Sequence, residues 1–525
     1  MVAKKNKTGT INQLRVGVVL SYINLILGNI IPIFYTPWML SLLGKNNYGL
    51  YTSAMSIVSY LSLLSLGMGT AVLRYLSKAL GENNLEEYRK LYGLFLNIFR
   101  VIAGVCFVVG IILSFSVGGI YGSTKSASEI ETLRILVLLM SINSSIGFLF
   151  SPYGSVITSH ERYIFLQIVN IITSVLPAFL NIAVLYIWPS PISLICVSLV
   201  LNIFIRVSYT IYIKKAIGVK PLYKKPKKGL VKELFFFTFW VFVASLVNQL
   251  QSQTDKLIIG YAMEFAWVGI YQIGATFETI TQSISLNISN VLTPKITKIV
   301  AGYCSDGDMK EIDMLLVRVG RLQFYVVTLI VSGFAVFGRQ FITLWVGDEY
   351  GADCLQAYWV AVLLILPSII PLVQNVAYSS LIALNKHKFR SIVYLCIAIA
   401  NVITTIPAVY NFGIVGAALM TNICSVIGTW FVMNWYYWKK IKLDIPGFWK
   451  VIAPRFIIPV GMCGVGLLVS KYIDFSANLL VLLSGIIVFT IVFFMLNWFI
   501  FMNDYEKDVF KKPVYGIIKK IKRSS

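Results

Sequence analysis

The sequence predicts an all-α membrane protein with fourteen transmembrane helices. We expect two six-helix lobes related by duplication, followed by two further helices. Three observations predict this fold. Of the 525 residues, 58% are hydrophobic and 13% are charged, whereas soluble domains are roughly half apolar and about a quarter charged. Apolar runs long enough to span a bilayer recur along the chain, and the chain repeats itself.

Each apolar run contains about 20 residues or more, the length that a helix needs to cross hydrocarbon. The first run follows a basic start but lacks a small-residue cleavage site, so we interpret it as a retained helix. The fourteen runs are 16–43, 48–73, 94–117, 132–157, 164–187, 192–213, 234–259, 268–293, 322–346, 355–383, 391–410, 414–438, 451–470 and 478–502.

Basic residues lie on alternate loops between these runs. The loops on one side of the predicted membrane hold 38 of the 45 lysines and arginines. This positive-inside pattern predicts an even number of spans and cytoplasmic N and C termini. The net charge of +23 therefore indicates contact with anionic membrane lipids and not binding to nucleic acid.

Short motifs recur in the same order in two parts of the chain. The matched pairs are YGLY at 48–51 with VGIY at 268–271, YGSVI from Tyr153 with YSSLI from Tyr378, and NIITSVLPAFLN from Asn170 with NVITTIPAVYN from Asn401. The offsets are about 220, 225 and 230 residues. We interpret the ordered matches as an internal duplication.

The duplication predicts three parts: an N-terminal lobe at 1–228, a C-terminal lobe at 229–445, and two helices with a basic cytoplasmic tail at 446–525. Pro221 and Pro226 keep the basic joint between the lobes extended. An even number of spans in each lobe gives both lobes the same orientation. Such parallel repeats are typical of alternating-access transporters with a site at the repeat interface.

Two proline pairs lie inside predicted helices, Pro32 with Pro37 and Pro367 with Pro371. Each proline removes a helical hydrogen bond and permits a bend. Single prolines are ordinary in membrane helices, but two close pairs favour a use as hinges.

Several landmarks resemble those of bacterial polysaccharide-transport flippases, in the multidrug/oligosaccharidyl-lipid/polysaccharide exporter superfamily. The first is LGKNNYGLYTSAMSIVSYLSLLSLGMGTAVLRYLSKAL at 43–80. The others are TDKLIIG at 254–260 followed by VGIY, LWVGDEY at 344–350 and YNFGIVGAAL at 410–419. These motifs are short, and they identify the polysaccharide-transport branch of the superfamily better than they identify the substrate.

The resemblance implies two six-helix lobes that face each other across a central cavity, with the last two helices appended. It also implies a multi-pass protein of the bacterial cytoplasmic membrane that flips an undecaprenyl-pyrophosphate-linked oligosaccharide to the outer leaflet. Its partners would then be this lipid-linked oligosaccharide, membrane lipids and other polysaccharide-assembly membrane proteins, and we expect a monomer. Two alternatives stay open within the superfamily: a cation-coupled multidrug exporter and a flippase of the peptidoglycan lipid precursor.

Polar side chains recur at helical spacing on the seventh and eighth predicted helices, where they form one face of each helix. Polar side chains on such faces can form hydrogen bonds to neighbouring helices, but the presence of carboxylates favours a water-lined cavity. The candidates are Asn248, Gln249, Ser252, Asp255 and Lys256 on the seventh helix, and Glu278, Gln282 and Ser285 on the eighth.

Depth distinguishes the charged candidates. Asp255 and Lys256 lie roughly 30 Å along the seventh helix, near the outer interface, where the pair is either structural or functional. Glu278 lies roughly 16 Å into the eighth helix, close to the midplane. A carboxyl group there suits coupling to a proton or sodium gradient.

A pyrophosphate requires cations, and a guanidinium can bind phosphate with two parallel hydrogen bonds. Arg100 lies inside the third helix, and four further arginines lie at the cytoplasmic ends of helices 2, 6 and 9. Those four also satisfy the positive-inside rule without any ligand. They are Arg74, Arg206, Arg318 and Arg321.

An enzyme is disfavoured because the predicted outer loops are very short and no acid, base or metal constellation is apparent. The two histidines, His160 and His387, lie in predicted cytoplasmic turns, and no nucleotide-phosphate loop occurs. The scattered cysteines indicate neither disulfides nor a metal site. We therefore expect no catalytic residue, metal or bound cofactor.

Overall fold

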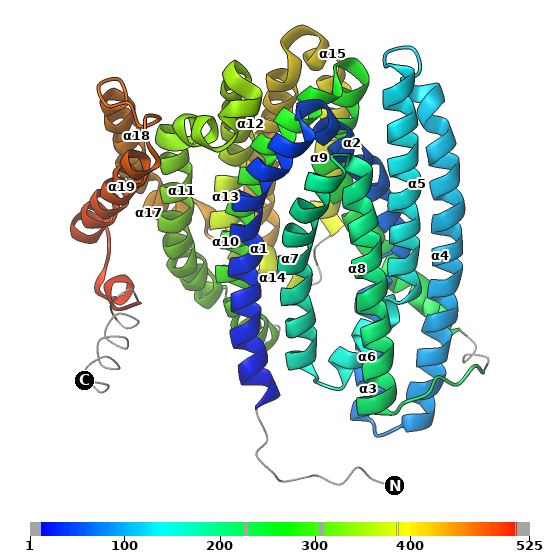
Figure 1. The fold of residues 1–525 in the computed structure, drawn as a ribbon. Coiled ribbons are helices and arrows are strands. Elements are labelled where there is room, and N and C mark those ends of the chain that lie inside the picture. Colours follow the sequence, from blue (N-terminus) through cyan, green and yellow to red (C-terminus); the bar gives the residue numbers. More distant parts are fainter. Residues whose placement is uncertain are drawn as a thin grey trace, which may run out of the picture. The chain divides into compact units, whose positions relative to one another are not determined.

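The computed structural model describes residues 12–224, 229–303, 309–384, 386, 388–509 and 511. Its regular elements within these residues are all helical (Figure 1). In this part of the chain, ten helical stretches are long and apolar enough to cross a membrane, which confirms the predicted all-α membrane class. The helices form two compact units, one ending at Gly269 and the other beginning at Ile270.

The first unit contains α1 to α9 and the start of α10. Its elements are α1 (Gln13–Leu43), α2 (Lys45–Ser59), η1 (Tyr60–Ser65), α3 (Met68–Gly81), α4 (Leu85–Tyr121), α5 (Ala127–Leu149), α6 (Ser151–Ser159), α7 (Tyr163–Ile187), α8 (Pro191–Tyr212), η2 (Ile213–Ile217), α9 (Leu230–Ala262) and α10 (Phe265–Tyr303).

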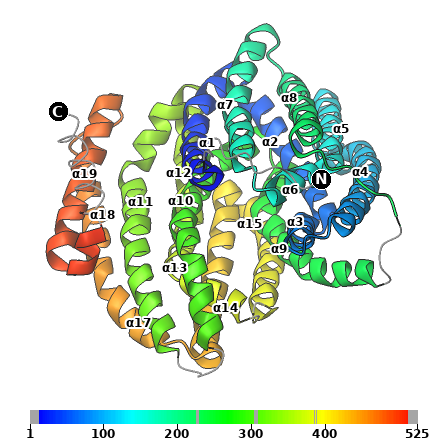
Figure 2. The ribbon, with the colours of Figure 1, turned by 90° about the horizontal axis from the view of Figure 1, so that it is seen from below.

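Two helix pairs organise this unit: α4 packs along α5 in the antiparallel direction, and α1 packs along α7 in the parallel direction, with Gln13 beside Ile164 and Asn24 beside Ser174 (Figures 1 and 2). The start of α5 is fixed by a capping box, in which Ser126 and Glu129 exchange side-chain and backbone hydrogen bonds. The division between the units falls one helix later than residue 228 because α9 packs on α2, α3 and η1. The lobe boundary at 228 remains a prediction from the repeat.

The second membrane segment is broken between η1 and α3. Leu66 and Gly67 both adopt left-handed backbone conformations, with φ of 49° and 67°. A side chain at Gly67 would collide with Val241 of α9, because an ideal Cβ would lie 2.2 Å from a Val241 methyl carbon. The break is therefore stabilised by tertiary packing, and no proline marks it.

The second unit contains the rest of α10 and all later elements. These are α11 (Lys310–Tyr350), η3 (Gly351–Asp353), α12 (Cys354–Ile365), η4 (Leu366–Ser368), α13 (Ile369–Val373), α14 (Asn375–Ala383), α15 (Lys388–Ser425), η5 (Val426–Val432), α16 (Met433–Tyr436), η6 (Tyr437–Ile441), α17 (Ile445–Ile452), η7 (Ala453–Phe456), α18 (Ile457–Val469) and α19 (Leu479–Ile500).

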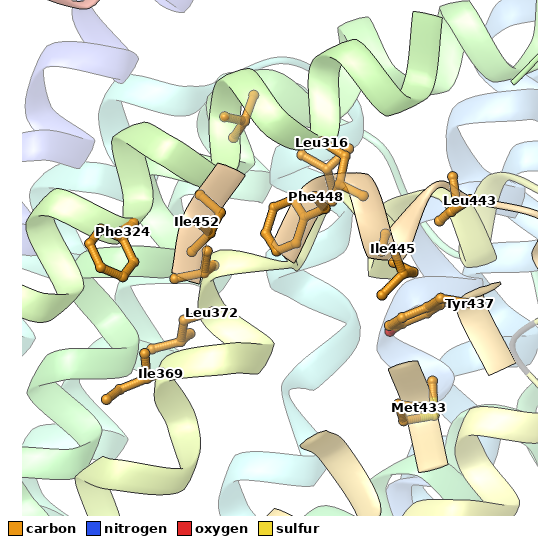
Figure 3. Close-up of a cluster of buried hydrophobic side chains, with 14 of the residues drawn as sticks. Leu316, Phe324, Ile369, Leu372, Met433, Tyr437, Leu443, Ile445, Phe448 and Ile452 are labelled. Atoms are coloured by element: carbon orange, nitrogen blue, oxygen red, sulfur yellow. The ribbon is translucent and has the colours of Figure 1, made fainter. Parts of the chain in front are cut away.

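Buried apolar side chains from α11, α13, η6 and α17 form a core of this unit (Figure 3). Phe448 of α17 is fully buried and lies against Gly320 of α11, where an ideal Cβ would be 2.7 Å from the Phe448 ring. A larger residue at Gly320 would push this ring away, so the glycine permits α17 to lie close to α11.

The proline pairs behave differently. Pro32 and Pro37 lie inside α1, which is one uninterrupted helix. Pro367 lies in the 3₁₀ turn η4, and Pro371 lies in the short helix α13. The second pair thus coincides with a break, while the use of either pair as a hinge remains a prediction.

A buried ion pair attaches the segment after α19 to α11. Arg321 Nε lies 2.6 Å from Glu506 Oε1, and Arg321 Nη2 donates to Glu506 Oε2 at 2.7 Å. Tyr325 and the backbone N–H of Asn503 also donate to this carboxylate, at 3.3 and 3.1 Å. Only 1% of Glu506 is exposed, so the whole carboxylate is solvated by protein groups.

We expect Arg321→Met to lower the thermal stability of the purified protein, because it leaves Glu506 as a buried charge without its cation. Removing one partner of a buried pair typically costs about 3–5 kcal/mol. The double variant with Glu506→Gln should recover part of the loss. Lys90→Met, which breaks an exposed pair with Glu86, serves as the control and should leave the melting temperature unchanged. A double variant no more stable than Arg321→Met would contradict the role assigned to this pair.

Candidate functional site

The polar candidates on α9 divide into an exposed part and a buried part. Asn248 and Ser252 are exposed, and the Ser252 hydroxyl donates to the Asn248 carbonyl at 2.9 Å. Gln249 is half-buried. Farther along the helix, only 2% of Asp255 and 7% of Lys256 are exposed. The two charged side chains are thus covered by protein atoms.

Lys256 Nζ donates to Gln253 Oε1 at 3.3 Å. The preceding Thr254 hydroxyl lies 2.8 Å from the Tyr60 hydroxyl of η1. This contact ties the buried end of α9 to the segment beside the Leu66–Gly67 break. A structural use and a functional use of the Asp255–Lys256 pair are both compatible with this placement.

Within the first unit, the turn between α9 and α10 packs closely against α2 and the loop before α5. Gly49 of the YGLY motif faces the Phe265 carbonyl, and an ideal Cβ at Gly49 would lie only 1.8 Å from that oxygen. Lys125 Nζ donates to the Met263 carbonyl and lies 5.1 Å from the centre of the Phe265 ring. Burial lowers the pKa of Lys125, although Glu129 and Glu264 oppose the shift.

On α10, Glu278 is half-buried and accepts a hydrogen bond of 2.8 Å from Gln282 Nε2, one turn later. Ser285 continues this face and is buried. The Ser285 carbonyl accepts a hydrogen bond of 3.5 Å from Gln323 of α11. Glu278, Gln282 and Ser285 therefore share one helix face, as their spacing predicts.

The arginines of the first unit differ in their surroundings. Arg74 and Arg100 are exposed. Arg100 donates to Asn97 at 3.0 Å and to the Tyr223 hydroxyl at 3.1 Å, and its guanidinium lies 5.3 Å from the centre of the Tyr223 ring. Arg206 is half-buried, and its Nε donates to Asn202 at 2.8 Å.

Tyr223 belongs to the joint that the sequence places between the lobes, and the described part of this joint lies along α4. The Leu222 N–H donates to the Arg89 carbonyl at 2.8 Å, and Arg89 Nε donates to the Lys220 carbonyl at 2.9 Å. At Gly93, an ideal Cβ would be 2.5 Å from the Leu222 carbonyl oxygen. The glycine thus gives the joint room to contact the helix backbone.

Arg318 and Arg321 line a pocket of about 350 Å³ in the second unit, together with Asp313, Asn503 and Glu506. Arg318 is exposed and lies 5.0 Å from the centre of the Tyr505 ring. Arg321 is held by Glu506, so a phosphate would have to displace that carboxylate to reach it.

His160 is half-buried rather than fully exposed in its turn. Its ring packs edge-on against Tyr88 with 5.3 Å between centroids, and its Nδ1 lies 2.9 Å from the Val156 carbonyl oxygen. Burial lowers the pKa of His160. His387 lies outside the described residues. Among the residues that the structure describes, no group of three or more His, Cys, Asp or Glu residues is placed to hold a metal ion.

Sequence reasoning missed four residues that the structure makes prominent: Glu506, Tyr223, Asn143 and Asn202. Glu506 and Tyr223 lie 185 and 123 residues from their arginine partners, and no local pattern indicates these pairings. Asn143 and Asn202 are amides inside apolar helices, and this signal alone could have identified them.

Comparison with known proteins identifies the relatives of the chain. The sequence model of the family described as "Polysaccharide biosynthesis protein" matches residues 39–355. A protein named as an O-antigen transporter of Shigella flexneri is 21% identical over 408 residues, which cover 76% of this chain and 92% of the relative. A protein named as a low-salt glycan biosynthesis flippase of Haloferax volcanii is 23% identical over 206 residues, covering 39% and 42%.

Two solved structures share the fold. The lipid II flippase MurJ in an inward closed conformation has a TM-score of 0.67 and 17% identity, covering 92% of this chain and 99% of that one. A multidrug resistance MATE family transporter in an inward-facing conformation has a TM-score of 0.64 and 11% identity, covering 83% and 99%. At these identities the similarity shows the fold alone.

We expect Gly49→Ala to destabilise the purified protein, because the new methyl group would overlap the Phe265 carbonyl. Gly28→Ala is the matched control, since no heavy atom lies within 4 Å of an ideal Cβ at Gly28 in α1. In a helix with free space, Gly→Ala is stabilising by up to about 1 kcal/mol. Thermal unfolding in detergent should shift in opposite directions for the two variants. An equal shift for both would show that the α9–α10 turn does not rest on Gly49.

Proposed function

The chain belongs to the polysaccharide biosynthesis protein family, and we propose that it is an alternating-access flippase. Its substrate would be an undecaprenyl-pyrophosphate-linked oligosaccharide that moves from the inner to the outer leaflet of the bacterial cytoplasmic membrane. The family match over residues 39–355 carries the proposal. The relatives named as an O-antigen transporter and a glycan flippase support it.

We further propose fourteen membrane helices. Two of the ten candidate spans, Lys310–Val373 and Lys388–Ile441, contain 64 and 54 residues and are long enough for two crossings each. Gly351 and Gly413 adopt φ values of 52° and 61° inside these stretches, where a reversal of direction is required. The helices α9 and α10, which are not among the ten spans, supply the remaining two crossings.

A repeated hydrogen bond supports the duplication. In the first unit, Asn202 Nδ2 donates to the Asn143 carbonyl at 3.0 Å. In the second unit, Asn422 Nδ2 donates to the Leu363 carbonyl at 2.7 Å. Asn422 and Leu363 follow Asn202 and Asn143 by 220 residues each. The same interhelical contact thus occurs at the offset given by the YGLY and VGIY motifs.

Within this proposal, the arginine candidates would bind the pyrophosphate, and Glu278 would couple transport to a proton or sodium gradient. Asn248 and Ser252 are exposed and can contact a hydrated substrate. Multidrug export and flipping of the peptidoglycan precursor are the competing functions, and the fold is common to proteins of both kinds.

The proposed topology predicts the location of reporter fusions. Fusions at Lys227, Ser305 and Ser525 should report the cytoplasm, whereas fusions at Asn46 and Asp474 should report the outside, because basic loops are retained inside. Paired alkaline phosphatase and fluorescent reporters provide the measurement. An outside signal at Lys227 would refute both the helix count and the parallel duplication.

The function predicts the effect of deleting the gene in its host. Lipid-linked oligosaccharide should accumulate and remain protected from an impermeant oxidant added outside spheroplasts. The wild-type gene should make the lipid-linked oligosaccharide accessible to the oxidant again. Glu278→Gln should restore less because the amide keeps the Gln282 contact but cannot ionise, whereas Thr279→Val, on the exposed neighbour, should act as wild type. If the deletion strain has normal levels of lipid-linked oligosaccharide and increased sensitivity to organic cations, the protein is a drug exporter. If the peptidoglycan lipid precursor accumulates, the protein is a flippase of that precursor.

A further inference from the structure

A chain of hydrogen bonds crosses from α5 to α8 and ends in a cation. Asn202 Nδ2 donates to both the carbonyl and the side-chain oxygen of Asn143, at 3.0 and 2.8 Å. The side-chain oxygen of Asn202 accepts from Arg206 Nε at 2.8 Å. Both ends of the Asn202 amide are therefore occupied, which fixes the amide and, through it, the plane of the guanidinium.

No carboxylate among the described residues forms an ion pair with Arg206. Its guanidinium lies 6.0 Å from the centre of the Tyr209 ring. On the opposing helix α5, Gly147 presents no side chain, and an ideal Cβ there would be 3.8 Å from Arg206 Nη2. The two Nη groups thus remain as donors beside a helix surface without a side chain at its nearest point.

A half-buried guanidinium without a counter-charge is costly in a membrane span. It is also unnecessary for holding the helices together, as the second unit demonstrates. There, Asn422 bonds to the Leu363 carbonyl without any arginine, and the residue equivalent to Arg206 at the 220-residue offset is Val426. Both units contain the interhelical hydrogen bond, but only the first unit has an arginine at this position.

We infer that Arg206 binds the phosphate of a lipid head group, and that Asn202 and Asn143 are positioning residues that orient its guanidinium. Arg206 lies about 22 Å along α8 from Pro191, at the cytoplasmic end of the span in the proposed topology. Two parallel N–H···O bonds to phosphate match this geometry. The phosphate belongs either to the polyprenyl pyrophosphate, in which case the inference rests on the proposed function, or to a phospholipid of the same leaflet.

The test compares binding of two probes, undecaprenyl pyrophosphate and phosphatidylglycerol, to the full-length protein in detergent by native mass spectrometry. Arg206→Ala should weaken binding of at least one probe by about tenfold or more, and Arg206→Lys should weaken it less because the charge remains. Asn202→Asp should also weaken binding of that probe, since its carboxylate would pair with the guanidinium of Arg206. It should lower thermal stability as well, because a carboxylate cannot donate to Asn143 as the amide does. A merely structural role for Asn202 predicts the loss of stability without the loss of probe binding.

Asn422→Ala is the matched control, because it removes the equivalent interhelical bond in the second unit. It should lower thermal stability and leave binding of both probes unchanged. Dependence of either probe on Arg206 supports the site and identifies the source of the phosphate. Binding of both probes that is unaffected by Arg206→Ala, or equally reduced by Asn422→Ala, would overturn the inference. Loss of lipid-linked sugar transport is measured separately in the deletion strain, so a failure of the proposed function leaves this result interpretable.

Discussion

Hydrocarbon offers no water to a polar side chain, so a hydroxyl, amide or charge on a spanning helix is costly unless it finds a partner in the protein, in a water-lined cavity or in a lipid head group. Many of the described hydroxyls satisfy the requirement locally, by donating to the carbonyl one turn earlier, as Thr328 and Ser380 do. Amides and guanidiniums have more N–H donors than the carbonyl one turn earlier can accept. Some of their bonds reach other helices, and these bonds add specific links to the apolar packing between helices.

The same constraint makes a small number of polar contacts informative. The Asn202–Asn143 bond joins α8 to α5, and the Gln374–Asn434 bond of 2.7 Å joins the break before α14 to α16. The buried Arg321–Glu506 pair does the same for a segment beyond the last membrane helix. In each case, a polar group that would be costly alone becomes a specific link between distant parts of the chain.

The apolar runs and the spacing of polar residues were sufficient to predict helices and shared faces, because both are local properties of a helix. Glu278 and Gln282 illustrate this success, since residues four apart on one helix contact each other. The break at Leu66–Gly67 could not be predicted in this way, because it depends on Val241 in another helix. The pairing of Glu506 could not be predicted either, because its partner Arg321 lies on α11 and the charge of a residue does not reveal which residue it pairs with.

The buried carboxylate of Glu506 also orders events during biosynthesis. Arg321 lies on α11 and is translated long before Glu506, so that the ribosome must complete α12 to α19 before the counter-charge exists. The contacts of Glu506 with Arg321 and Tyr325 can therefore form only after the last membrane helix has been synthesised, so the second unit completes this part of its packing late in translation.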